Sequence, residues 1–384
     1  MTAIGLLVVA LPYVWSAPHP GTAEPIFPST VAAYDWWTSG LSASEMDAAI
    51  AMYRNGVGVE FFDAPQAVVL ASDGSTYRRL GVSEELTIAD DQGDPAPSVL
   101  SPDGTFVVVG NAGGGSEVTV ATLRDNSQRS LDIGNGRAAV PVSIRADGKQ
   151  VLLLVSTGSL SRYTDYTFRL HGALVSLNLD TGAVREYATL TDVNSAALSP
   201  DGARIVADTG DGIVLVDVAD GSAQLLDVPV IDAPYIDGDA WSPNGQRLAF
   251  LSGNELHIVA VSEAQPVHRA IPLTGIEFGT AIGWRDDTSV LLHTSDDPEG
   301  NRSSFSWVDT ESGDTERFSE YTPNFTGAAL GSADFARDLV SVMVVADRPA
   351  DRGFLPLGVN SALALALGFV VWAVSPRSSA SPRN

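Results

Sequence analysis

The sequence repeats a short turn motif every 43 to 54 residues, and this period restricts the fold more than any other feature. Each copy centres on an Asp or Asn, followed in four copies by Gly, and a run of apolar residues comes next. The Asp or Asn stands at positions 103, 147, 201, 244, 287 and 338, which gives steps of 44, 54, 43, 43 and 51 residues. Repeats of this length are typical of β-propeller blades with four strands each.

The residue types within each copy favour a tight hairpin. In Ser101-Pro102-Asp103-Gly104, Pro fixes φ at the first turn position, Asp caps the turn and Gly accepts a positive φ. A second hairpin signal follows in the segments 174–187, 213–226 and 305–318, so that two hairpins supply the four strands of a blade. The predicted structural turn residues are Asp103, Gly104, Asp147, Gly148, Asp201, Gly202, Asn244, Gly245 and Asp287.

The best copies are Trp241-Ser242-Pro243-Asn244-Gly245 and Leu198-Ser199-Pro200-Asp201-Gly202. Together with the following Asp-x-x-Gly hairpin, they resemble the repeats of WD40-like, TolB-type β-propellers. The resemblance covers about residues 63–346 and implies an architecture without implying an activity. The copies at 145–148, 285–287 and 335–338 depart from the motif.

The two ends of the repeat region each look like half a blade. Residues 67–80 read as a hairpin with no strands before it, and residues 339–346 read as a strand with no hairpin after it. We expect them to join, so that N- and C-terminal strands pair and close the ring without exposed edges. The prediction is therefore an all-β, six-bladed propeller over residues 63–346, with seven blades as the alternative if residues 25–62 supply further strands.

Residues 18–62 are expected to form an extended stalk and a short helix. Pro18, Pro20, Pro25 and Pro28 favour an extended start. Ser42 and Glu45 form a capping-box pattern, which predicts a helix to about Arg54.

The chain is apolar at both ends. Residues 354–374 hold 21 residues without charge, enough for a transmembrane helix of about 30 Å. A buried core helix is the alternative for this stretch. If residues 354–374 span the membrane, residues 375–384 form a short cytoplasmic tail. Residues 1–17 are read as a second hydrophobic membrane segment whose start is incomplete, with a signal peptide or a short anchor as alternatives. We expect the propeller to lie on the extracytoplasmic side of the cell membrane.

Composition excludes several classes of protein. The chain has 47 acidic and 22 basic residues, a net charge of −25 and no cysteine. Phosphate contacts need clustered Lys and Arg, so we expect no nucleic-acid partner. Cysteine-ligated zinc and disulfides are impossible. The 45% of hydrophobic residues argues against disorder.

The sequence shows no catalytic set, and we predict no cofactor and no metal. The five histidines stand at unrelated points of the repeat, and His257 and His293 fit structural roles in strands. The run 110–115 is rich in Gly but lacks the Lys and helix of a phosphate-binding loop. The acidic clusters 90–94, 208–211 and 296–299 lack the spacing of a calcium loop and are read as solvated.

One pattern suggests a binding face. In a propeller, the loops between blades and those between the second and third strands open onto the same side. Aromatic residues fall in three successive inter-blade loops, and the long loop 156–173 adds an Arg and two Tyr. The candidate binding residues at the channel mouth are Arg162, Tyr163, Tyr166, Tyr235, Phe278, Tyr321 and Phe325. The alternative is that they pack between the blades.

We therefore interpret the chain as a non-enzymatic, membrane-tethered β-propeller that presents an extracytoplasmic face to a protein partner. The alternative is an extracytoplasmic hydrolase or lyase for glycan or peptide, with groups from different blades converging at the channel mouth. Such convergence leaves no mark in sequence spacing.

Overall fold

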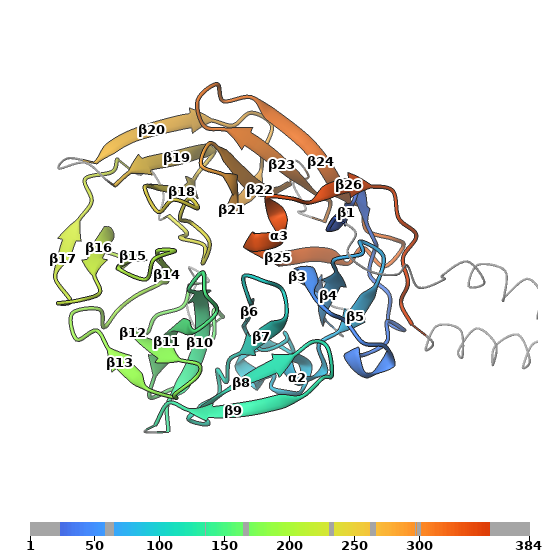
Figure 1. Ribbon diagram of the computed structural model, residues 1–384, viewed down its shortest axis with the longest axis horizontal. Coiled ribbons are helices and arrows are strands. Elements are labelled where there is room, and N and C mark those ends of the chain that lie inside the picture. Colours follow the sequence, from blue (N-terminus) through green and yellow to red (C-terminus); the bar gives the residue numbers. More distant parts are fainter. Residues whose placement is uncertain are drawn as a thin grey trace, which may run out of the picture.

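The computed structural model describes residues 24–57, 65–134, 136–163, 169–229, 234–261, 266–295, 297 and 301–353. Within these residues, six mainly antiparallel sheets stand around a central axis, and the chain visits them in order around the ring (Figure 1). Regular structure is almost entirely strand, and the helices are short. The fold is an all-β, six-bladed propeller, which confirms the prediction from the repeat and excludes the alternative of seven blades.

Blades two, three and four have four strands each, counted outwards from the axis. Blade two has β6 (Ser98–Leu100), β7 (Phe106–Val109), β8 (Glu117–Thr122) and β9 (Gln128–Asp132). Blade three has β10 (Ala138–Ile144), β11 (Gln150–Ser156), β12 (Ala173–Asn178) and β13 (Val184–Glu186). Blade four has β14 (Ser195–Leu198), β15 (Arg204–Asp208), β16 (Ile213–Asp217) and β17 (Ala223–Leu225).

Blade five has the strands β18 (Arg247–Ser252), β19 (Glu255–Ala260) and β20 (Val267–Pro272). Blade six has β21 (Phe278–Asp286), β22 (Ser289–Ser295), β23 (Ser303–Asp309) and β24 (Thr315–Tyr321). Blade one combines β25 (Ala329–Phe335) with β3 (Ala49–Val57), β4 (Gln66–Ala71) and β5 (Tyr77–Arg79). The helices of the described residues are η1 (Leu41–Ala43), α2 (Gly81–Glu85), η2 (Ala89–Asp91) and α3 (Arg337–Val340).

The repeated motif forms the turn between the first two strands of a blade. Gly104, Gly148, Gly202 and Gly245 have φ values between 67° and 74°, which only Gly adopts without strain. The Asp or Asn before each Gly accepts a hydrogen bond from a backbone N–H two residues on, at 2.9–3.1 Å. The local chemistry of the motif therefore explains why these four copies make hairpins, whereas the copy at Asp338 lies in helix α3.

Blade six differs from the prediction. Asp286 rather than Asp287 caps its turn, by accepting from the Thr288 N–H at 2.8 Å. Asp287 accepts from the Asn244 N–H at 2.9 Å instead and so links blade six to the turn of blade five. The missing Gly shifts the turn by one residue.

The core consists of apolar layers between neighbouring blades. Strand β11 is buried along both faces, and its side chains alternate between two layers. Leu152 and Leu154 pack with Ile205 of blade four, whereas Leu153 packs with Val108 of blade two. Successive side chains of a strand point to opposite faces, so a sheet packed on both sides needs a continuous apolar run.

The ring closes by pairing the two ends of the described chain, but not in equal halves. Strand β25 contributes only the innermost strand of blade one, and β3, β4 and β5 from the N-terminal side supply the other three. The predicted helix from Ser42 to about Arg54 is wrong. A single 3-10 turn at Leu41–Ala43 precedes strand β3, which pairs with the next strand, β4, and on ring closure with β25.

The prediction of a strand over residues 339–346 also needs correction. Helix α3 occupies Arg337–Val340, and only Val344–Ala346 is a strand, β26. Strand β26 pairs in parallel with β1 (Ile26–Pro28), outside the six blades. Strand β2 (Thr30–Val31) adds a fifth, parallel strand to blade six through β24.

Both predicted membrane segments, residues 1–17 and 354–374, and the tail 375–384 lie outside the described residues. Among the residues that are described, no helix combines the length and apolar character needed to cross a membrane.

Candidate functional site: the central channel

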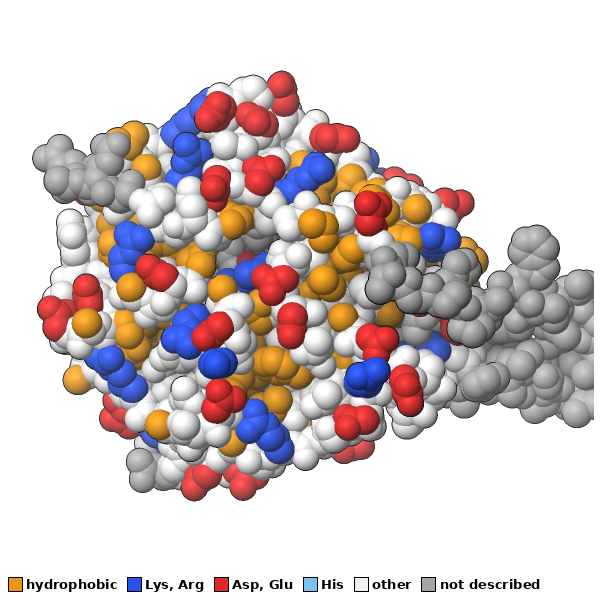
Figure 2. Space-filling view, in the orientation of Figure 1, with side chains coloured by type: hydrophobic (Ala, Val, Ile, Leu, Met, Phe, Trp, Pro, Cys, Tyr) orange, Lys and Arg blue, Asp and Glu red, His pale blue; other side chains and the backbone are white. Residues whose placement is uncertain are grey.

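A cavity of about 510 Å³ lies in the middle of the ring. Inner strands β25, β6, β10, β14 and β21 all contribute to its wall, together with residues 235–239 of blade five. Figure 2 shows one face of the ring, where acidic and basic side chains alternate with apolar ones around the centre. Charged residues line the cavity as well: Arg54, Asp91, Asp94, Arg162, Arg169, Asp237, Asp239, Asp334 and Arg337.

Blade five opens its inner edge to the cavity. Where the other blades have an innermost strand, residues 235–241 make only two isolated bridges, Tyr235 with Leu251 and Trp241 with Leu248. This irregular segment carries Asp237 and Asp239 in the cavity wall. Gly238 lies between them, and a side chain at that position would come within 2.3 Å of the Val142 carbonyl oxygen of blade three. The close approach of the two backbones requires Gly here.

Three carboxylates and one guanidinium form a cluster in this part of the channel. Arg337, the first residue of α3, places Nη2 2.6 Å from Asp239 Oδ1 and donates to the Ile144 carbonyl at 2.5 Å. Asp334 Oδ2 on β25 accepts from the Leu100 N–H at 2.6 Å. Helix α3 lies at the centre of the ring (Figure 1), which explains why Arg337 reaches residues of blades three and five.

Burial and mutual repulsion disfavour the ionised forms of these carboxylates. Burial raises the pKa of Asp237 to about 7, and the charge of Asp239 adds to the shift. The pKa of Asp334 is raised well above its usual range by burial and then by Asp239 and Asp237. Burial also raises the pKa of Asp239, against the opposing charge of Arg337. At neutral pH the cluster therefore carries fewer than three negative charges.

A second group of charges is built from two loops. Arg162 Nη2 contacts Asp94 Oδ2 at 2.5 Å, and the Tyr163 hydroxyl donates to the same oxygen at 2.9 Å. The loops are held together by Ser159, whose hydroxyl donates to Asp90 Oδ2 at 2.7 Å. Asp90, in the acidic segment 90–94 that we read as solvated, thus has a structural role.

Arg169 and His293 complete the polar lining. Arg169 Nη1 contacts Asp208 Oδ2 at 2.7 Å, and Nη2 donates to the Pro234 carbonyl at 3.0 Å. Burial lowers the pKa of His293 to about 4, and its ring stacks on Phe305 with centroids 4.9 Å apart. His293 is thus a neutral, packed imidazole at neutral pH.

The structure brings only some of the predicted mouth residues together. Arg162, Tyr235 and Phe278 line the cavity, and Tyr163 contacts Arg162. Phe325 is 92% exposed and lies away from the cavity lining.

Tyr321 is fully buried. Its hydroxyl lies 2.6 Å from the Ala328 carbonyl and 3.1 Å from Asn55 Oδ1, so it packs between blades, as the alternative reading supposed. Tyr166 lies outside the described residues.

Sequence reasoning missed Arg54, Asp237, Asp239, Asp334 and Arg337. A signal was present in Asp237-Gly238-Asp239, which stands where an apolar inner strand should precede the turn motif. Asp334 likewise interrupts the apolar inner strand β25. Among the described residues, no group of three or more His, Asp or Glu side chains is arranged to hold a metal ion.

Comparison with known proteins adds little beyond the fold. No protein-family model matches the chain. No curated protein sequence is similar to it. Among solved structures, TolB from Acinetobacter baumannii is similar with a TM-score of 0.49 and 16% identity, over 75% of this chain and 67% of that one.

Two further solved structures show the same range of similarity. For the putative TolB from Agrobacterium tumefaciens the TM-score is 0.44 with 15% identity, over 62% of this chain and 89% of that one. For oligogalacturonate lyase from Vibrio parahaemolyticus the TM-score is 0.45 with 11% identity, over 74% of this chain and 78% of that one. Similarity at this level carries no conclusion about activity or partners.

Proposed function

We propose that this chain is a non-enzymatic, membrane-tethered propeller whose channel mouth binds a protein partner outside the cytoplasm. The supporting observation is that Tyr235 and Phe278 are 55% and 57% exposed at the cavity, with Arg162 among the same lining residues. Aromatic and Arg side chains are enriched in the energetically important centres of protein interfaces.

The alanine variant Tyr235→Ala/Phe278→Ala tests the binding face. A matched control is Leu225→Ala/Val267→Ala, because these apolar side chains are 60% and 55% exposed but lie on the outer strands β17 and β20. Cells expressing the tagged full chain are crosslinked, and the captured proteins are compared by mass spectrometry. We expect the mouth variant to lose a partner that the control retains, with equal melting temperatures.

Two outcomes contradict the proposal. Equal capture by the mouth variant and the wild type would show that the partner binds elsewhere. A mouth variant that unfolds at a lower temperature than the control would show that these aromatics pack rather than bind.

Membrane tethering is the second part of the proposal. It is supported by the apolar residues 3–17 and 354–374 and by the parallel pairing of β1 with β26, which brings the two ends of the described chain together. We expect the full chain to resist alkaline extraction from membranes and a chain without residues 354–384 to be extracted more readily. Recovery of the full chain in the soluble fraction would exclude tethering.

A hydrolase or lyase acting on glycan or peptide is the second candidate. The observation that favours it is the set of partly buried carboxylates, because a carboxyl with a pKa of about 7, such as Asp237, suits a general acid or base at neutral pH. The purified full chain would be incubated with polysaccharide and peptide libraries. Product formed by the wild type and abolished by Asp237→Asn would replace the binding function with this one.

A further inference from the structure

Four arginines line the channel, although the chain as a whole has 47 acidic and only 22 basic residues. Three of the four are committed to carboxylates: Arg337 to Asp239, Arg162 to Asp94 and Arg169 to Asp208. The fourth, Arg54, makes no hydrogen bond or ion pair with any residue of the described part of the chain. Its guanidinium is therefore available to a ligand.

The position of Arg54 depends on ring closure. Arg54 is in the second strand of blade one, β3, and faces a register shift of the inner strand β25 between Leu330 and Ala333. The two residues within that shift, Gly331 and Ser332, are small and line the cavity beside Arg54. The shift therefore lets a side chain of the second strand contribute to the channel.

A cation without a direct ion pair in such a place is energetically costly. Arg54 is only partly exposed, and burial together with the neighbouring charge of Arg162 lowers the pKa of its guanidinium. Desolvation of a charged group costs several kcal/mol unless an opposite charge or hydrogen-bond acceptors compensate for it. An anion bound between the two guanidinium groups would remove most of this cost.

We propose that the channel binds a small organic monocarboxylate, with Arg54 as the main contact and Arg162 beside it. A carboxylate matches the fork of a guanidinium and accepts two parallel hydrogen bonds from it. A single negative charge suits the site better than the two of phosphate, because Asp91 and Asp94 act on Arg54 from the same wall. This proposal stands independently of the protein partner proposed above.

The rest of the cavity indicates the body of the ligand. A volume of about 510 Å³ is within the range of small-molecule sites. Tyr235 and Phe278 line the same cavity as Arg54 and offer aromatic surface to a ring or an aliphatic chain. We therefore expect a carboxylate with a compact ring to bind more tightly than acetate.

Calorimetric titration of the full chain with defined probes tests this proposal. The probes are benzoate, acetate, inorganic phosphate and benzyl alcohol, which has the ring of benzoate without its charge. We expect binding in the order benzoate, acetate, phosphate, with no measurable binding of benzyl alcohol. The variant Arg54→Met should weaken benzoate binding at least about tenfold, the loss typical of a charged hydrogen-bonding partner.

The control variant is Arg129→Met, an exposed arginine on the outer strand β9, and it should bind benzoate as the wild type does. Because Arg54 makes no hydrogen bond or ion pair with the described residues, Arg54→Met should melt at the same or a higher temperature than the wild type in buffer without carboxylates. A wild type that binds none of the anions, or an Arg54→Met variant that binds benzoate unchanged, would overturn the proposal. A large drop in the melting temperature of Arg54→Met would show that Arg54 is structural and would overturn it as well.

Discussion

Arg337 and Asp239 form an ion pair of 2.6 Å that joins helix α3 to the irregular inner edge of blade five, across the centre of the ring. Both side chains are mostly buried, and Arg337 is the cation that opposes the raised pKa values of Asp237, Asp239 and Asp334. We predict that Arg337→Met lowers the free energy of unfolding by about 2–4 kcal/mol at pH 8, because it leaves buried carboxylates without a counter-ion.

The loss should shrink at pH 4, because Asp237, with a folded-state pKa of about 7, is protonated there. Denaturant unfolding at the two pH values measures the difference. Arg124→Met is the control, since Arg124 and Asp47 form an exposed pair at 3.2 Å that contributes less than about 1 kcal/mol. Equal losses for the two variants at pH 8 would refute the role of Arg337.

For replacement of Asp237 we predict the opposite change, a gain in stability at pH 8. Its folded-state pKa of about 7 is higher than the usual 3.8, so its contribution to stability is fully present below pH 3.8 and is lost as the pH rises through 7. We therefore expect Asp237→Asn to raise the melting temperature at pH 8, by the equivalent of about 1–2 kcal/mol, and to leave it unchanged near pH 3. Calorimetry across this range checks the prediction, and a variant less stable than the wild type at pH 8 would contradict it.

His257 and His268 form a pair on the adjacent strands β19 and β20. His257 Nδ1 lies 2.8 Å from His268 Nε2, and both pKa values are lowered, mainly by burial. Because their folded-state pKa values are lowered, the stability that the two neutral histidines contribute is present above pH 6.5 and is lost as the pH falls below it. We predict that His268→Gln makes the decline in melting temperature between pH 7 and pH 5 shallower.

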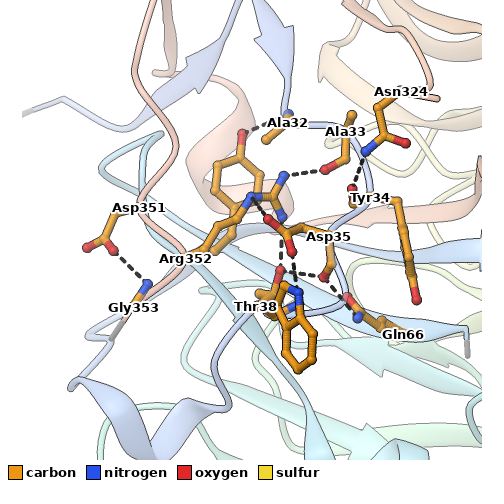
Figure 3. A network of polar contacts seen from close by, with 12 residues as sticks. Ala32, Ala33, Tyr34, Asp35, Thr38, Gln66, Asn324, Asp351, Arg352 and Gly353 are labelled. Atoms are coloured by element: carbon orange, nitrogen blue, oxygen red, sulfur yellow. Dashed lines mark hydrogen bonds and ion pairs between the residues drawn. The ribbon is translucent and has the colours of Figure 1, made fainter. Parts of the chain in front are cut away.

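Arg352 holds the end of the described chain against its beginning (Figure 3). It donates to the Thr38 hydroxyl at 2.9 Å and to the Ala33 carbonyl, and its Nε lies 3.7 Å from Asp35 Oδ2. We expect Arg352→Met to cost about 2–3 kcal/mol, because it leaves these acceptors unpaired in a mostly buried place. Chemical denaturation measures the loss. A loss no larger than that of Arg302→Met, at an exposed arginine, would contradict this role.

Trp241 and Trp284 make the same contact in successive blades. The Trp241 indole donates to the Ala197 carbonyl at 3.1 Å, and the Trp284 indole donates to the Ala240 carbonyl at 3.0 Å. Each Trp→Phe change should cost about 1 kcal/mol, the net contribution of the one hydrogen bond that is lost. Because Ala240 adjoins Trp241, we expect the two losses to be non-additive. A double-mutant cycle measures the coupling, with the half-exposed Trp37→Phe as the control.

Turn chemistry made the blades predictable. The residues Ser199-Pro200-Asp201-Gly202 specify their own hairpin through contacts of two to five residues, such as the Ser199 hydroxyl to Asp201 Oδ1 at 2.6 Å. Such contacts need no partner elsewhere in the chain. The repeat of this motif therefore predicted the ring and the number of blades.

The predictions that were wrong concern residues whose structure depends on pairing with segments distant in sequence. Ser42 and Glu45 resemble a helix start, yet Ala49–Val57 is a strand because β25, nearly 300 residues away, and β4 complete its hydrogen bonds. Tyr321 looked like a mouth aromatic, but the N-terminal residues that bury it are not neighbours in sequence. Tertiary pairing outweighs propensity in both cases.

The channel illustrates the same limit. Sequence alone determined that this chain is an acidic ring of six blades, because residues close in sequence specify the turns and the apolar strands of the repeats. Only the tertiary structure decided that Asp237, Asp239, Asp334 and Arg337 meet at the axis. It also decided that Arg54 lines the same cavity with no ion-pair partner among the described residues. The physical reason is that the inner edges of separate blades converge only after the ring closes. Burial at that point raises the pKa values of Asp237, Asp239 and Asp334.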